Sequence, residues 1–420
     1  MINATRTERI LLVDDSKTLS KLISLKVKSE LKLEIDVAYS LSEAELFTKK
    51  YTYTLAILDL NLPDAPNGEV VDIILKKNIP SIVLTGSVDK EFRKAMLKKD
   101  IIDYVHKGGI HDIDYVIDII KRLVKNRSHK VMVVDDSSIF RNQMKKMVEN
   151  LFFQVYALAH GEEALLILEQ NPDIKIIITD YNMPVMDGLE LTKAVRQKYT
   201  KNQLSIFVLS STEDSDVSAM FLKRGANDFI NKPFSKEEFS CRLNNAIEAL
   251  ENIDTITHFA SRDFLTGLYN RRHFFTVMGP YFIDAVNRDE EFILALIDID
   301  NFKTINDTYG HDIGDQVIIH VSEILRSNVQ FQDVVSRFGG EEFCLVLKDT
   351  TREKALEILE RIRQRIALTP LQIAPEQELF LSVSIGAALE HDNSLNDTIN
   401  EADAQLLHAK NSGKNRICAK

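Results

Sequence analysis

The sequence predicts an α/β protein with open parallel sheets over its first two thirds, followed by a unit with a different pattern. In the first two thirds, short apolar runs alternate with amphipathic stretches of about 10 to 15 residues, which is typical of parallel strands joined by helices. The pattern also repeats, because Asp14 and Asp59 recur 121 residues later as Asp135 and Asp180. The last third instead contains two neighbouring apolar runs separated by a glycine pair, which predicts a hairpin.

Composition narrows the class of protein. A chain of 420 residues should hold roughly three domains. Its net charge of −11 argues against a nucleic-acid-binding output domain, which would need clustered Lys and Arg. The three cysteines have no paired spacing, and no signal peptide or bilayer-length apolar run is evident. We therefore expect a cytoplasmic protein that does not insert into a membrane.

Each copy of the repeat places polar residues where strands end. In the first copy Asp14 and Asp15 follow the first strand, Asp59 ends the third, Thr85 the fourth, and Lys107 follows the fifth. The carboxyl ends of parallel strands meet at one edge of a sheet, so these side chains should converge. Three close carboxylates repel one another unless a divalent cation such as Mg²⁺ lies among them.

The second copy carries the same set as Asp135, Asp136, Asp180, Ser210 and Lys232. A single Asp at a strand end is often only a helix N-cap. Five landmarks that return in the same order make that alternative a poor account of the whole set.

This constellation resembles the receiver domain of bacterial response regulators, over residues 7–125 and 128–250. The resemblance implies two doubly wound flavodoxin-like domains, phosphorylated on Asp59 and Asp180 by a histidine kinase or a phosphotransfer protein. It also implies that the acidic residues hold Mg²⁺ and that six residues form the switch, namely Thr85, Tyr104 and Lys107, and Ser210, Phe229 and Lys232.

The two copies match the receiver pattern unequally. The second reads DYNMPVMDG after its strand and Lys232-Pro233-Phe234 later, close to the family pattern. The first has one extra residue between Asp59 and Gly68, a shortened segment between Asp59 and Lys107, and Gly108 where the family usually has Pro. Its chemistry residues are kept, so we predict phosphorylation at both sites.

A long helix is predicted from Ser235 onward, with apolar residues at Leu243, Ile247, Leu250 and Ile256. Its first part is the last helix of the second receiver. Residues 251–262 extend beyond a receiver, so we expect a linker helix that joins two domains and pairs with its counterpart in a second subunit.

The hairpin of the last third has the sequence RFGGEEF. Gly339 and Gly340 supply the positive φ angles of a two-residue turn, and Glu341 and Glu342 follow at once. In isolation this would be a surface turn. Asp298 at the end of the strand 292–297, together with the two glutamates, could hold the two divalent cations that assist phosphoryl transfer.

Further residues of the last third suit a nucleotide. Lys303 can neutralise charge that grows on phosphates, and the amide of Asn306 with the carboxylate of Asp315 can read the edge of a guanine. Lys410 and Lys414 add two cations one helical turn apart. Each has a plain alternative, as a turn residue, a cap or a solvated helix end.

Together the motifs DFLTGLYNRR, DIDNFKTINDTYGHDIGD, RFGGEEF and AKNSGKNR resemble the GGDEF domain of diguanylate cyclases, over residues 263–420. The resemblance implies an α+β ferredoxin-like palm that condenses two GTP molecules into cyclic di-GMP. Its implied site comprises catalytic Glu341, Glu342 and Lys303, Mg²⁺ (or Mn²⁺) ligands Asp298, Ile299, Glu341 and Glu342, and substrate-binding Asn306, Asp315, Gly339, Gly340, Lys410 and Lys414.

One position departs from family members that are inhibited by their product. Their Arg-x-x-Asp motif corresponds to Gln330 through Asp333, with Gln330 in place of the arginine. An amide cannot offer the charged bidentate fork of a guanidinium, so strong feedback inhibition is not expected.

The order of domains resembles response-regulator diguanylate cyclases. It implies a homodimer in which each cyclase domain contributes one GTP, with receiver phosphorylation favouring the productive arrangement. Two alternatives stay open: a catalytically silent GGDEF module that binds GTP or cyclic di-GMP, and a phosphorelay scaffold in which only the receivers matter.

Overall fold

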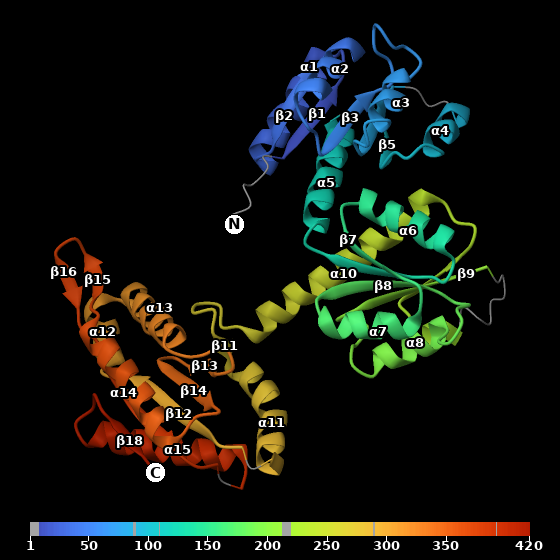
Figure 1. Ribbon diagram of the computed structural model, residues 1–420. Coiled ribbons are helices and arrows are strands. Elements are labelled where there is room, and N and C mark those ends of the chain that lie inside the picture. The colour runs from blue at the N-terminus through green and yellow to red at the C-terminus, as the bar shows by residue number, and fades with distance from the viewer. Residues whose placement is uncertain (1–7, 87–89, 109, 212–219, 289, 392) are drawn as a thin grey trace. The chain divides into compact units, whose positions relative to one another are not determined.

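The computed structural model describes residues 8–86, 90–108, 110–211, 220–288, 290–391 and 393–420 (Figure 1). The chain divides into two compact units, Met1–Ile253 and Asp254–Lys420. The first unit holds two parallel sheets, and the second holds a six-stranded mixed sheet and a small two-stranded sheet formed by β15 and β16.

The first sheet has five parallel strands in the order β2-β1-β3-β4-β5. The apolar side chains of its strands point alternately to two faces, where α1 and α5 cover one and α2, α3 and α4 the other. Its elements are β1 (Arg9–Val13), α1 (Lys17–Lys26), the π-helix η1 (Val27–Leu31), β2 (Glu34–Ala38), α2 (Leu41–Lys50), β3 (Leu55–Asp59), α3 (Glu69–Leu75), β4 (Ser81–Thr85), α4 (Lys90–Leu97), β5 (Asp103–His106) and α5 (Ile110–Asn126).

The second sheet repeats this topology in the order β10-β9-β8-β6-β7, again with five parallel strands. Figure 1 shows α7 and α8 on one side of it and α6 and α10 on the other. Its elements are β6 (Lys130–Val134), α6 (Ser138–Asn150), β7 (Gln154–Leu158), α7 (Gly161–Gln170), β8 (Ile174–Asp180), α8 (Gly188–Arg196), β9 (Ser205–Ser210), β10 (Asp228–Asn231) and α10 (Lys236–Ser261).

The last unit is built on a six-stranded mixed sheet in the order β11-β13-β14-β12-β17-β18. Helices α12, α13 and α14 pack on one face and α11 and α15 on the other. Its elements are β11 (Tyr269–Asn270), α11 (Arg271–Arg288), β12 (Phe292–Ile299), α12 (Phe302–Tyr309), α13 (His311–Ser327), β13 (Val334–Gly339), β14 (Glu342–Lys348), α14 (Arg352–Leu368), β15 (Leu371–Ala374), β16 (Gln377–Leu379), β17 (Val383–Ala388), α15 (Leu395–Asn411) and β18 (Ile417–Ala419).

These sheets confirm the predicted fold class. Both parallel sheets have the strand order of flavodoxin-like domains, in which ligands collect at the carboxyl ends of the strands. Helix starts follow local sequence: the hydroxyl of Ser16 accepts from the N–H of Leu19, and that of Ser137 from Phe140, at equivalent places in the two copies.

The hairpin of the last unit forms, but its turn differs from the expected glycine pair. A register shift after Arg337 lets β13 continue through Gly339, which pairs with Glu342. The turn is therefore Gly340-Glu341, and of the two glycines only Gly340 has a positive φ, +34°. Glu341 consequently lies at the tip and Glu342 begins the next strand.

Helix α10 is longer than a receiver helix, as the apolar pattern predicts. Leu243, Ile247 and Leu250 are buried, whereas Ile256 and Phe259 further along are 66% and 76% exposed. Among the described helices, none combines the length and the hydropathy needed to cross a bilayer.

Candidate active site and phosphorylation sites

The first parallel sheet brings its predicted polar residues to one edge. Oxygen atoms of Asp14, Asp15 and Asp59 all lie within 4.8 Å of one another. The ammonium of Lys107 stands among them, 2.6 Å from Asp14 and 2.8 Å from Asp59. An all-oxygen cluster of this kind suits Mg²⁺, and the lysine gives a phosphoryl group a positive partner.

Burial sets the electrostatics of this edge. Asp14 is fully buried and Asp59 only 5% exposed. Burial raises the pKa of Asp14, although the contact with Lys107 opposes that rise. A cation bound here would reinforce Lys107 in keeping the carboxylate of Asp14 ionised.

In the second sheet the corresponding residues, Asp135, Asp180 and Lys232, lie less close together. Lys232 lies 2.5 Å from Asp180 but 3.4 Å from Asp135. Within the described ranges, no trio other than that of the first receiver brings its acidic oxygens within 4.8 Å of one another. The sequence ranked the second copy nearer to the family pattern, whereas the first is the more closely gathered of the two. Burial again raises the pKa of Asp135, against the effect of Lys232.

The predicted switch residues take the expected places on the strands. Thr85 and Ser210 end β4 and β9 and are both buried, and Lys107 and Lys232 directly follow β5 and β10. The ring of Phe229 stacks on Phe221 at 5.9 Å. The hydroxyl of Tyr104 is buried with no hydrogen-bond partner among the described residues, so rotation of this ring would break no bond found there.

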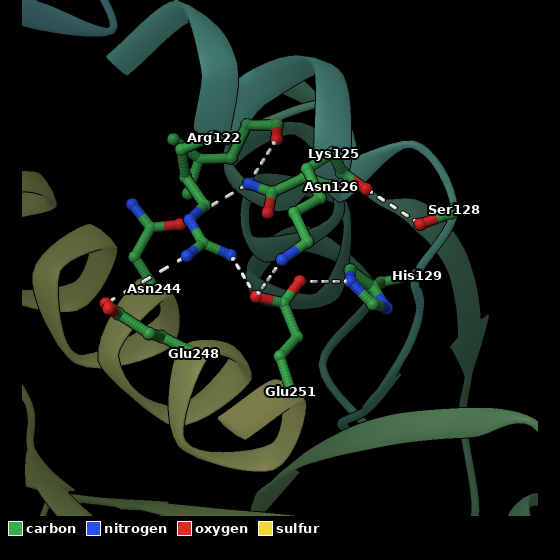
Figure 2. A network of polar contacts seen from close by, with 9 residues as sticks. Arg122, Lys125, Asn126, Ser128, His129, Asn244, Glu248 and Glu251 are labelled. Carbon is green, nitrogen blue, oxygen red and sulfur yellow. Dashed lines mark hydrogen bonds and ion pairs between the residues drawn. The ribbon is translucent and has the colours of Figure 1, made fainter. Parts of the chain in front are cut away.

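A polar cluster joins the two receivers within the first unit (Figure 2). The carboxylate of Glu251 on α10 receives Arg122 at 2.9 Å and Lys125 at 2.8 Å from α5, and His129 at 2.7 Å. Beside it, the buried amide of Asn126 donates to the carbonyl of Leu151 at 3.0 Å. No local sequence pattern points to this junction, because Glu251 lies more than a hundred residues from Arg122, Lys125 and His129.

We predict that the Glu251 cluster stabilises the receiver pair in a pH-dependent way. Burial alone would raise the pKa of Glu251, but bonds from Lys125, Arg122 and His129 lower it from its ordinary 4.5 to about 2. Since the folded pKa is the lower one, the stabilisation is present above pH 4.5 and is lost as the pH falls towards 2.

Replacing Glu251 with Gln should therefore lower the free energy of unfolding of the first unit by about 1 kcal/mol at pH 7, after allowance for screening by solvent. Urea denaturation followed by circular dichroism measures it, with Glu248→Gln as the control. Glu248 is on the same helix but lies 3.9 Å from Arg122 and is 58% exposed. Equal effects of the two substitutions at pH 7 would contradict the prediction.

In the last unit the central strand and the hairpin bring three carboxylates together. Asp298 on β12 pairs directly with Glu342 on β14, so their side chains lie on the same face. Like charges in such a pair repel, unless a cation lies between them. Glu341 at the turn is held through its carbonyl, which accepts from the N–H of Ile299 at 3.4 Å.

The ammonium of Lys410 supplies positive charge at this place, 2.8 Å from Asp298. Asp298 is 6% exposed, and burial raises its pKa while Lys410 opposes the rise and the two glutamates add to it. A carboxylate with this balance fits a divalent cation, which would keep it ionised. The predicted ligand set thus suits Mg²⁺ in its chemistry.

Asn306 and Asp315 lie on consecutive helices, α12 and α13. The Oδ1 atom of Asn306 is buried and has no hydrogen-bond partner within the described part of the chain. A side chain at Gly314 would place its Cβ 1.9 Å from that oxygen, and only glycine leaves the amide where it is. Asp315 and Lys303 are exposed to solvent.

The glycines of the hairpin leave room for a ligand. A Cβ added at Gly339 or Gly340 would meet no atom within 4 Å. Lys414 lies shortly after the end of α15. Its ammonium donates to the side chain of Asn301, the residue directly before α12, at 2.6 Å. Of the residues predicted to bind nucleotide, Lys410 therefore lies beside Asp298 and Lys414 beside the start of α12.

Sequence reasoning missed one residue that shapes this site. Arg337 donates to the carbonyl of Gly340 at 3.0 and 2.8 Å and forms an ion pair with Asp263 at 3.0 Å. It thereby fixes the turn that carries Glu341. The available signal was a charged pair spread over the DFLTGL and RFGGEEF motifs.

Residues 330–333, where the sequence departs from the motif of product-inhibited relatives, form local hydrogen bonds. The carboxylate of Asp333 accepts from the backbone N–H groups of Gln330 at 2.7 Å and of Lys348 at 3.1 Å. The expectation that product inhibition is weak stays a prediction.

Comparison with known protein families assigns both parts of the chain. Residues 10–116 and 131–244 match the response regulator receiver domain, and residues 260–416 match the diguanylate cyclase GGDEF domain. The response regulator PleD of Caulobacter vibrioides (strain NA1000 / CB15N) is 26% identical over 98% of this chain and 99% of its own.

Two further relatives cover parts of the chain. Diguanylate cyclase DgcM of Escherichia coli (strain K12) is 36% identical over 43% of this chain and 43% of its own. A crystal structure of a two-component system response regulator/GGDEF domain protein is 38% identical over 58% of this chain and 99% of its own, with a TM-score of 0.51. The chain therefore belongs to the response regulators, with two receiver domains followed by a GGDEF domain of the diguanylate cyclase family.

Proposed function

We propose that this protein is a phosphorylation-regulated diguanylate cyclase that condenses two GTP molecules into cyclic di-GMP and two pyrophosphates. The observation that supports this most is the direct pairing of Asp298 with Glu342 beside the open turn at Gly340. The alternative of a silent GGDEF module is less favoured, because no predicted acidic or base-reading residue is lost.

The predicted site residues bind different parts of GTP according to their side-chain chemistry. Asn306 and Asp315 hold the guanine through amide and carboxylate hydrogen bonds, while Gly339 and Gly340 let the phosphates approach the backbone. Lys303, Lys410 and Lys414 bind phosphate oxygens, where positive charge stabilises the negative charge that develops during transfer. The 3′-oxygen of each GTP then loses its proton to solvent and forms a bond to the α-phosphorus of the other GTP, and each α-phosphorus releases pyrophosphate, so two bonds form and two break.

Asp298, Glu341, Glu342 and the carbonyl of Ile299 would hold Mg²⁺ or Mn²⁺, which supplies Lewis-acid activation of the 3′-hydroxyl and the phosphate. A cation bound to Asp298 would compete with Lys410 for that carboxylate. Its ammonium lies on Asp298 at 2.8 Å, and it would leave that carboxylate for the phosphates when nucleotide binds.

Each cyclase domain offers one such half-site, so the reaction requires a homodimer. We propose that phosphorylation of Asp59 and Asp180 shifts the population towards the productive dimer, with the linker helix as the connection. The exposed Ile256 and Phe259 of α10 are apolar side chains available for pairing with a second copy.

The test is direct. The purified full-length protein is incubated with GTP and MgCl₂, with and without beryllofluoride, and cyclic di-GMP is quantified by liquid chromatography. We expect product in both states, with more product and more self-association after beryllofluoride treatment. No product in either state would favour the silent module or the phosphorelay scaffold.

A further inference from the structure

Asp300 is a buried carboxylate to which the proposed chemistry assigns no role. It lies two residues beyond Asp298 and is 5% exposed. Its oxygens accept from the hydroxyls of Ser384 at 2.6 Å and Ser382 at 2.7 Å, and from the backbone N–H of Asn415 at 3.0 Å. A buried carboxylate is stable only with such donors. The bond from Asn415 also ties a segment that is distant in the sequence to the residue that follows β12.

That segment has an uncommon backbone. Lys414 and Asn415 have φ angles of +61° and +44°, and Asn301, which receives the ammonium of Lys414, has +58°. Residues other than glycine enter this region at a cost and stay there where surrounding contacts hold them. The position of Lys414 therefore depends on what fixes its neighbours.

A second group also holds Asn415. Arg363 on α14 donates to the side-chain oxygen of Asn415 at 2.6 Å and to its carbonyl at 3.2 Å. The guanidinium is itself oriented by two bonds to Glu360, at 2.8 and 2.6 Å. Such a bidentate pair fixes the plane of the guanidinium as well as its charge.

We propose that Asp300, Arg363 and Asn415 form a clamp that positions Lys414 for the triphosphate of GTP. The inference rests on the proposed function, since it takes Lys414 as a phosphate ligand. The three are positioning residues: they do not touch substrate, and they act through Lys414. Misplacing a charged group by about 1 Å is enough to weaken such an interaction strongly.

The experiment is a double-mutant cycle on the full-length protein. Binding of a non-hydrolysable GTP analogue with Mg²⁺ is measured by calorimetry for wild type, Arg363→Gln, Lys414→Ala and the double variant. We expect Arg363→Gln and Lys414→Ala each to weaken binding about tenfold, as for loss of one charge-assisted bond. The double variant should be no weaker than Lys414→Ala alone, because Arg363 acts through Lys414.

Matched variants separate positioning from general damage to the fold. Arg365→Gln removes the same charge from α14, but its described contact is with Asn328 at 3.4 Å, and it should bind like wild type. Asp300→Asn keeps an oxygen for the N–H of Asn415 and should bind more tightly than Asp300→Ala. Thermal unfolding verifies that the variants are folded.

The outcomes distinguish the two proposals. Additive effects in the double variant, or equal affinity in wild type and Arg363→Gln, would overturn the clamp alone. A wild type that binds the analogue yet makes no cyclic di-GMP would overturn the proposed function while leaving the clamp to be judged on affinity. A wild type that binds no analogue would remove both.

Discussion

Replacing Glu342 with Gln is expected to lower the rate of cyclic di-GMP formation by roughly 10²–10³-fold. Glu342 faces Asp298 across two antiparallel strands, and the amide of Gln cannot supply the negative charge that a divalent cation needs there. Because Glu342 is exposed and the replacement has the same shape, the fold of the hairpin should be kept. Initial rates at saturating GTP and one fixed MgCl₂ concentration, the same for wild type and variant, provide the measurement.

The loss should appear in the dependence on metal as well as in the rate. Raising the MgCl₂ concentration should recover part of the activity if the glutamate binds the cation. Glu357→Gln is the control, since it removes one exposed carboxylate from α14 and none from β12 or β14. A Glu342→Gln variant as active as the Glu357→Gln variant would remove Glu342 from the catalytic site.

Most of what the sequence could predict came from the internal repeat and from the polar residues at the ends of the expected strands. The apolar alternation placed Asp14, Asp59 and Lys107 at one edge, because in a parallel sheet the ends of strands meet whatever the loops do. The flavodoxin-like order of the strands was expected from the resemblance to receiver domains and not from this pattern. Local rules therefore sufficed for the receivers and for the pairing of the hairpin strands.

Other parts of the site depend on contacts without a local signal. The turn at Gly340 rather than at the glycine pair results from a register shift, which depends on how β13 pairs with β14. Arg337 meets Asp263 over 74 residues, and Asp300 meets Asn415 over 115. Such partners are chosen by tertiary packing, and residue type alone cannot rank them among the many other charged side chains.

The second large effect concerns the receivers, where single replacements of Asp59 and Asp180 by Asn should each remove one of two phosphorylation sites. Incubation with ³²P-labelled acetyl phosphate and MgCl₂ should label wild type at both, and each single variant at one. The double variant should take up no label, because the amide of Asn is a poor nucleophile for the phosphoryl group. Asp118→Asn serves as a control, since this side chain is 69% exposed and pairs only with Lys121 among the described residues.

The geometry also predicts how the two sites differ. Labelling of Asp59, measured in the Asp180→Asn variant, should be the faster, because the three acidic oxygens of the first receiver already lie within 4.8 Å of one another and can take Mg²⁺ with little rearrangement. In the second receiver, no trio of acidic oxygens lies that close among the described residues, so its aspartates must rearrange before they can take Mg²⁺. Chelating the metal should abolish both reactions. Unchanged labelling in both single variants and in the double variant would show that these aspartates are not the acceptors, and faster labelling of Asp180 would show that loop sequence outweighs the preformed acidic cluster.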